Sequence, residues 1–288
     1  MQLRFHQPVS IEEAHEYLQN GVDDTVLIGG GTAMVLALHN GTVGAQRIVH
    51  LGRIRDERFR EIKTKRDGII IGGGVTITEL IQDASIREKY PSLVAAGRIV
   101  ATPRIRNTAT VAGSVLEGNF AADLPTALAG VGAEAIIESF GAKRRVPVYD
   151  LVNARIDRQP YAILPGEILT RISVPHVAGV AHYLRRSRRR IADRPLVSVA
   201  SVLRRLPTGD DQFEAIIGGA TARLERYRLN LESGWRDSNT LVEGHLDDLF
   251  ASAVFLDDHR ASAWYREELL RSILRASFRA VATQVGNQ

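Results

Sequence analysis

The chain has 288 residues, of which 44% are hydrophobic and 24% charged, and its formal net charge is +4; this balance is typical of a globular protein of two or three subdomains. It contains no cysteine, which excludes disulfides, thiolate zinc sites and iron–sulfur clusters bound by its own cysteines. No apolar run approaches the roughly 20 residues of a membrane helix, and the N-terminus lacks the apolar core of a signal peptide, so we expect no membrane span and a cytoplasmic location.

The first 52 residues are predicted to form an α/β unit. Residues 11–20 form an amphipathic helix in this prediction, since Ser10 can cap it and acidic residues follow in the first turn. A short buried strand is expected over residues 26–28, a helix over 34–38 and a second strand over 47–51.

A glycine-rich segment, Ile28-Gly29-Gly30-Gly31-Thr32-Ala33, connects this first strand to the helix that follows it. Glycine permits positive φ and lets backbone N–H groups approach a ligand. Alone the segment is weak evidence, because a tight strand-to-helix turn explains it equally well.

The next part of the chain continues the alternation of strands and helices. A hairpin is predicted over residues 61–72, and Thr76 with Glu79 has the pattern of a capping box for a helix at 77–82. A further helix is expected at 92–100, ended by Pro103, and another at 125–128. Further strands are predicted at 133–138, 144–149 and 167–174.

A second glycine-containing segment, Thr110-Val111-Ala112-Gly113-Ser114, lies about eighty residues after the first. It is predicted to be a loop that continues into the polar stretch 117–125, which includes Asp123. Long ordered loops are frequently functional. Two such segments therefore indicate a phosphate-bearing ligand held from two sides.

The C-terminal part differs in character. Residues 181–205 are predicted to form a hairpin interrupted by a basic run at 185–190, and a strand is expected at 213–217. The remainder is predicted to be helical, most clearly at 263–281, where the apolar residues fall on one face. The basic run suits nucleic acid, a phosphate ligand or an acidic partner, or it is a solvated loop; since no aromatics are interleaved with it, nucleic acid is not expected.

Three common cofactor-binding and catalytic motifs are not present in the sequence. After Gly29 and Gly31 the third small residue of a dinucleotide-binding fingerprint is replaced by Met34, and no acidic residue follows at the required distance. There is no Gly-Lys-Ser/Thr sequence and no nucleophile elbow. These absences argue against a Rossmann enzyme, a P-loop protein and a nucleophile-based hydrolase.

Taken in order, the two segments resemble the FAD-binding medium subunit of the molybdenum hydroxylases, which include xanthine dehydrogenases and aerobic carbon monoxide dehydrogenases. The resemblance covers nearly the whole chain. Its first motif, commonly Ala-Gly-Gly-Thr/His-Asp/Ser, is matched by residues 29–33, and its second, Arg-Asn-x-x-Thr-x-Gly-Gly-Asn/Asp, by residues 106–114. Residues 118–125, 166–175 and 262–266 resemble three further family segments.

The resemblance implies an α+β fold. It comprises a two-part FAD-binding α/β domain of the vanillyl-alcohol-oxidase type, residues 1–52 and 53–175, followed by a C-terminal α+β subdomain, residues 176–288. The cofactor-binding residues that it implies are Ile28, Gly29, Gly30, Gly31, Thr32, Ala33, Thr110, Ala112, Gly113, Ser114, Leu116, Asp123, Ile168, Leu169 and Arg185.

By resemblance, both segments donate backbone N–H groups to the FAD diphosphate, and Thr32 and Thr110 add hydroxyls. Asp123 then lies at the ribityl or flavin region, and Ile168 or Leu169 packs on the flavin ring. Arg185 is expected to bring a positive charge toward the flavin, where it would stabilise the reduced, anionic form.

Some residues depart from the family pattern. Ala33 replaces a polar residue, Ala112 a glycine, and Ser114 an Asn or Asp. If position 112 needs positive φ, alanine there costs up to about 1 kcal/mol or more. Glu117 is expected to repel the diphosphate unless its side chain points away.

In the family, this subunit passes electrons from iron–sulfur clusters to FAD and then to an acceptor such as NAD or oxygen. The implied partners are a molybdopterin-binding large subunit and a [2Fe–2S] small subunit, in a dimer of heterotrimers. The alternative is a non-catalytic assembly subunit with a degenerate flavin site, which uses its basic run as a docking surface. An independent oxidase with covalent flavin is disfavoured, because such enzymes have a large substrate domain and no anchoring cysteine is present.

Overall fold

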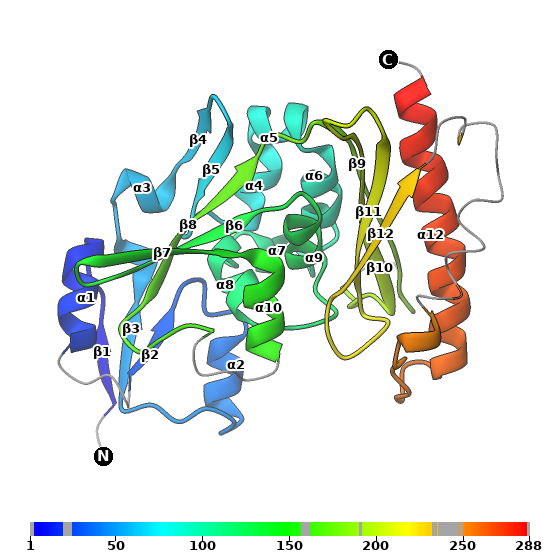
Figure 1. Ribbon diagram of the computed structural model, residues 1–288. Helices are drawn as coiled ribbons and strands as arrows, with labels where there is room; N and C mark the ends of the chain where they lie inside the picture. Colours follow the sequence, from blue (N-terminus) through cyan, green and yellow to red (C-terminus); the bar gives the residue numbers. More distant parts are fainter. Residues whose placement is uncertain are drawn as a thin grey trace.

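Three β-sheets with helices around and between them make up the molecule (Figure 1). The computed structural model describes residues 3–19, 25–156, 162–189, 192–231, 235, 247 and 250–286. The predicted mixture of helix and sheet is confirmed. No helix in these residues combines the length and hydropathy needed to cross a bilayer.

The first sheet has three parallel strands in the order β1-β3-β2. These are β1 (Arg4–His6), β2 (Thr25–Ile28) and β3 (Arg47–His50). Helices α1 (Ile11–Gln19) and α2 (Met34–His39) lie in the connections, close to their predicted positions. Ser10 caps α1 by accepting a hydrogen bond from the Glu13 N–H at 3.1 Å. Because the strands are parallel, the carboxyl ends of β2 and β3 lie at the same edge, where the first glycine segment begins.

The second sheet has five antiparallel strands in the order β4-β5-β8-β6-β7. They are β4 (Ile62–Lys65), β5 (Gly68–Gly72), β6 (Glu134–Ser139), β7 (Ala142–Pro147) and β8 (Ile168–Pro175). The predicted β4–β5 hairpin is confirmed. The buried side chains of this sheet form one cluster with those of the neighbouring helices.

In the part of the chain that the structure describes, eight short α-helices accompany this sheet. They are α3 (Glu57–Arg60), α4 (Ile77–Gln82), α5 (Ala84–Lys89), α6 (Pro91–Arg98), α7 (Pro103–Arg106), α8 (Val111–Leu116), α9 (Asp123–Gly130) and α10 (Val148–Ile156). Pro103 does not simply end a helix: it begins α7, where its missing N–H is not needed. The strand predicted at 144–149 is too long, because Val148 and Tyr149 already belong to α10.

The third sheet is antiparallel, in the order β12-β11-β10-β9. Its strands are β9 (Gly179–Arg186), β10 (Val197–Arg205), β11 (Asp211–Gly218) and β12 (Glu225–Leu231). Helix α12 (Ala263–Gly286) packs on this sheet, on the opposite side of the molecule from α1 (Figure 1). The predicted hairpin around the basic run and the predicted C-terminal helix are both confirmed.

Strand β12 shows that the prediction of an entirely helical remainder is wrong. Tyr227, Leu229 and Leu231 are buried, and the residues between them are exposed. This two-residue alternation is the strand period. Its outer face carries Arg226 and Arg228, which lie near Glu214.

The capping box of α4 gives a test of local folding. The Glu79 N–H donates to Thr76 Oγ1 at 3.2 Å, and the Thr76 N–H donates to Glu79 Oε2 at 2.7 Å. We expect Thr76→Ala to lower the free energy of unfolding by about 0.5–2 kcal/mol in urea denaturation, because one N–H loses its acceptor. Thr76→Ser keeps the hydroxyl and is expected to stay near wild type; an equal loss in both variants would assign the effect to the methyl group.

Candidate functional site

A cleft of about 680 Å³ lies where the first sheet, helix α8, strand β8 and the β9–β10 connection meet. This volume is within the range of small-molecule and cofactor sites. All the residues that the sequence singles out line it, except Arg185: Ile28, Gly29, Gly30, Gly31, Thr32, Ala33, Thr110, Ala112, Gly113, Ser114, Leu116, Asp123, Ile168 and Leu169. Segments that are distant in the sequence therefore form one site.

The first glycine segment runs from the end of β2 into α2 and touches the second segment directly. A Cβ added to Gly30 would lie 1.9 Å from the carbonyl oxygen of Thr108, and one added to Gly29 would lie 2.8 Å from Thr110 Oγ1. Gly31 has a φ of +71°, in the left-handed region. Glycine is thus required here by close approach of two backbones.

Free hydrogen-bond donors are concentrated in this first segment. Within the described residues, the N–H groups of Gly30, Gly31 and Thr32 donate to no protein acceptor. Ala33, the N-cap residue of α2, provides no side-chain cap. Unpaired N–H groups between a strand and a helix N-terminus form a concavity suited to an anion.

The second segment is not the expected loop but the first turns of α8. Thr110 is its N-cap, and Thr110 Oγ1 accepts a hydrogen bond from the Gly113 N–H at 3.1 Å. The Ala112 N–H donates to the Gly73 carbonyl at 3.3 Å, and the Ser114 N–H to the Thr110 carbonyl at 2.9 Å. These backbone donors are used within the protein, so the hydroxyls of Thr110 and Ser114 are the polar groups that this segment offers to the cleft.

Ala112 lies in the helical backbone of α8, so the expected cost of placing alanine at a position of positive φ does not arise. Among the described non-glycine residues, positive φ occurs only at Ala101 and Ala192. Alanine at 112 therefore has no left-handed strain.

An apolar wall closes one side of the cleft. Ile168 and Leu169, at the start of β8, are 1% and 2% exposed. Leu51 and Phe59 line the same cleft and share a core cluster with Ile168. Leu51 and Phe59 cannot be recognised as site residues from the sequence, because their apolar character alone does not separate a cleft wall from an ordinary core.

Asp123, at the first position of α9, is buried at 6% exposure and held by two side chains of β9. Tyr183 Oη donates to Asp123 Oδ1 at 2.7 Å, and Arg185 Nη1 donates to Asp123 Oδ2 at 2.9 Å. Burial raises the pKa of the Asp123 carboxyl, and the Arg185 charge opposes that rise. Burial, followed by the Asp123 charge, raises the pKa of Tyr183 well above its usual value.

Arg185 is placed differently from the expectation. It does not line the cleft, and its guanidinium forms an ion pair with Asp123 and also donates to the Asp193 carbonyl at 2.9 Å. Its positive charge is therefore compensated by a carboxylate. Its neighbours Arg186, Arg188 and Arg189 are exposed, and Arg190 lies outside the described residues.

The β9–β10 connection contributes a further wall that is not evident from the sequence. Ala192, Asp193 and Arg194 line the cleft. Arg194 Nη2 forms an ion pair with Glu117 Oε1. The Arg194 charge therefore offsets the negative charge of Glu117, which the sequence led us to expect would repel a bound phosphate.

The unpaired N–H groups, the hydroxyls and the apolar wall fit a ligand with a diphosphate and a large flat ring, as FAD has. The fold and site therefore define a protein that binds such a dinucleotide. Comparison with known proteins makes the class specific: the family model described as "FAD binding domain in molybdopterin dehydrogenase" matches residues 1–177. The chain belongs to this family.

Relatives extend the match beyond that domain. The chain is 24% identical over 276 residues to the glyceraldehyde dehydrogenase medium chain of Sulfolobus acidocaldarius, covering 95% of this chain and 96% of that protein. It is 26% identical over 281 residues to the nicotine 6-hydroxylase medium subunit of Paenarthrobacter nicotinovorans, with 95% of each covered. The xanthine dehydrogenase FAD-binding subunit of Escherichia coli O157:H7 is 30% identical over 145 residues, 50% of this chain and 49% of that one.

Solved structures share the fold. A Cu,Mo-CO dehydrogenase chain superimposes with a TM-score of 0.84 at 21% identity, covering 98% of both chains. Quinoline 2-oxidoreductase from Pseudomonas putida 86 gives a TM-score of 0.82 at 21% identity, covering 99% of this chain and 98% of that one. The chain is thus an FAD-binding medium subunit of a molybdenum hydroxylase-type dehydrogenase, an oxidoreductase component, as the sequence resemblance implies.

Proposed function

We propose that this subunit takes electrons from iron–sulfur clusters on a partner and passes them through FAD to an external acceptor. The proposed partners are a molybdopterin-binding large subunit and a [2Fe–2S] small subunit, in a dimer of heterotrimers, with NAD or oxygen as acceptor and a cytoplasmic location. The observation that carries the proposal is that one cleft combines unpaired N–H groups with an apolar wall. The absence of cysteine from the sequence supports it, because the clusters must then reside on another chain.

Each part of the cleft has a proposed role. The N–H groups of Gly30, Gly31 and Thr32 would hold the diphosphate, and the hydroxyls of Thr110 and Ser114 would add donors. FAD supplies the redox chemistry when bound, since it can hold the electrons that arrive singly. The protein's part is to orient the cofactor and to keep water away from the ring.

Ile168 and Leu169 would pack on the flavin ring and exclude water from it. Asp123 would accept a hydrogen bond from the ribityl chain or the ring, with Tyr183 and Arg185 as positioning residues. Because Arg185 is paired with Asp123, the pair presents no net charge when both are ionised. This differs from the uncompensated positive charge that the sequence predicts, so we assign Arg185 a positioning role and propose no direct contact of its charge with the reduced flavin.

FAD uptake by the purified full-length chain is the test. We expect a yellow protein with flavin absorbance and one FAD per chain after reconstitution, with the flavin released on denaturation. A colourless protein that takes up no added FAD would contradict the proposal and favour an assembly subunit with a degenerate site. Anaerobic mixing with the reduced iron–sulfur partner is then expected to bleach the flavin absorbance, and persistent colour would reject the electron route.

A further inference from the structure

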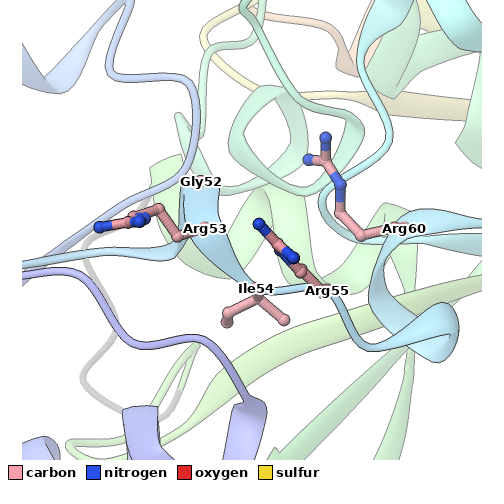
Figure 2. Close-up of a pocket in the computed structure, with 5 residues that line it drawn as sticks. All are labelled: Gly52, Arg53, Ile54, Arg55 and Arg60. Carbon is pink, nitrogen blue, oxygen red and sulfur yellow. The ribbon is translucent and has the colours of Figure 1, made fainter.

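A second pocket, of about 440 Å³, lies beside the proposed FAD cleft and is lined by Gly52, Arg53, Ile54, Arg55 and Arg60. We call it the arginine pocket. Figure 2 shows Arg55 and Arg60 extending to the same side from neighbouring stretches of chain, whereas the Arg53 side chain extends away from them on the preceding turn. Three of its five lining residues therefore carry a fixed positive charge at any physiological pH.

These charges are not compensated by carboxylates. Within the described residues, Arg53, Arg55 and Arg60 form no ion pair, although acidic residues are close in sequence. Those are engaged elsewhere: Asp56 and Glu12 pair with Arg58, and Glu57 pairs with Lys63. The pocket is thus left with an excess of positive charge while its neighbours are neutralised.

Arg60 is exposed, and one hydrogen bond to the protein orients its side chain. Its Nη1 donates to the Gly74 carbonyl at 2.8 Å, while its Nη2 and Nε have no partner in the described part of the chain. A guanidinium held in this way keeps donors available in a fixed direction. Such a fork matches the oxygens of a phosphate better than a mobile lysine would.

The arginine pocket and the FAD cleft share their supporting core. Leu51 and Phe59 line the cleft, whereas their sequence neighbours Gly52 and Arg60 line the arginine pocket. Ile54, at 1% exposure, lies in the same cluster as Phe59 and the cleft-wall residue Ile168. A ligand in the arginine pocket would therefore lie immediately beside the cofactor site, on a rigid floor.

We propose that the arginine pocket binds the phosphate groups of a second small molecule, a diphosphate-bearing ligand placed next to the flavin. A diphosphate carries negative charge and acceptor oxygens on both of its phosphates, so it matches the guanidiniums of this pocket better than a single carboxylate does. The pocket is concave and formed by five residues, which suits a compact anion rather than the broad surface of a protein partner. The position beside the flavin rests on the proposed function; the anion site itself does not.

The test measures binding to the FAD-loaded full-length chain by equilibrium dialysis, with inorganic pyrophosphate and NADH as separate probes. We expect saturable binding that weakens at least about tenfold, or about 1.4 kcal/mol, in an Arg53→Gln/Arg55→Gln double variant. The control, Arg87→Gln/Lys89→Gln, removes the same two charges from exposed positions on α5 and is expected to bind within twofold of wild type.

Each outcome decides the proposal. Tight binding of NADH but weak binding of pyrophosphate, with both sensitive to the double variant, identifies a dinucleotide as the source of the diphosphate; equal binding identifies a free diphosphate. If neither probe binds, or if the control variant loses as much affinity as the Arg53→Gln/Arg55→Gln variant, the arginine pocket is not the anion-binding site. Poly-glutamate that binds where pyrophosphate does not would overturn it in favour of an acidic protein surface.

Flavin absorbance is recorded on the same samples. A chain that takes up no FAD contradicts the proposed function, yet pyrophosphate binding that depends on Arg53 and Arg55 still supports the arginine pocket. The two failures are therefore distinguishable.

Discussion

Replacement of Gly30 by alanine is expected to weaken FAD binding at least about 100-fold, or about 2.7 kcal/mol. An added Cβ would lie 1.9 Å from the Thr108 carbonyl oxygen and 2.6 Å from its carbon. Both atoms are backbone, so the two segments must separate, and the N–H groups proposed to hold the diphosphate move away from Thr110. The measurement is the dissociation constant of FAD, from flavin fluorescence during titration of the apoprotein.

Gly44→Ala is the matched control, because an added Cβ at Gly44 meets nothing within 4 Å and its φ is not positive. It is expected to bind FAD like the wild type. Thermal unfolding of both apoproteins shows whether a loss of binding reflects loss of fold. If folded Gly30→Ala bound FAD normally, the proposed diphosphate site would be wrong.

Removal of the buried Arg185 charge is expected to cause the largest loss of stability, about 3–5 kcal/mol for Arg185→Met. The Arg185 and Asp123 side chains are only 8% and 7% exposed. Without Arg185, the Asp123 carboxylate keeps its desolvation cost but loses its counter-charge. Urea denaturation at neutral pH measures the difference in the free energy of unfolding.

Two further variants separate charge from packing. Arg185→Lys retains a positive charge and is expected to lose less stability than Arg185→Met. The double variant Asp123→Leu/Arg185→Met removes both charges and is also expected to lose less than the single variant, because no unpaired charge stays buried. Equal losses in Arg185→Met and in the double variant would show that the ion pair is not the cause.

The loss in Arg185→Met is expected to depend on pH. Burial raises the pKa of Asp123 in the folded state above its unfolded value, and Arg185 limits the rise. A group with a raised folded pKa binds its proton more tightly when folded, so its contribution to stability falls as pH rises through that window. Removing Arg185 raises the pKa further. The deficit of Arg185→Met relative to wild type is therefore expected to be smaller near pH 4 than near pH 7, and a deficit independent of pH would contradict this.

Local sequence was sufficient for elements whose signals lie within a few residues. The Thr76–Glu79 capping box and the apolar face of α12 were predicted close to where they occur. Strand β12 was missed although its alternation is readable, because the polar residues Arg226, Arg228 and Asn230 on its outer face obscure the apolar pattern.

Family motifs in the sequence also indicated FAD and the residues proposed to bind it, since Gly29–Gly31 and Thr110–Ser114 have recognisable chemistry. What the sequence could not decide is which donors are free. Gly113 and Ala112 belong to a helix whose N–H groups are used by Thr110 and Gly73, and that follows from where α8 packs.

By itself, then, the sequence determined the helices and strands with strong local periodicity, the lack of cysteine ligands and the cofactor class. Tertiary structure alone decided that Gly30 faces the Thr108 carbonyl. It also decided that Arg185 neutralises Asp123, 62 residues away in the sequence. Finally, it placed Arg55 and Arg60 at the lining of one pocket. The physical reason is range: capping and periodicity act between neighbours in the chain, whereas close approach, burial and charge pairing depend on which distant segments pack together.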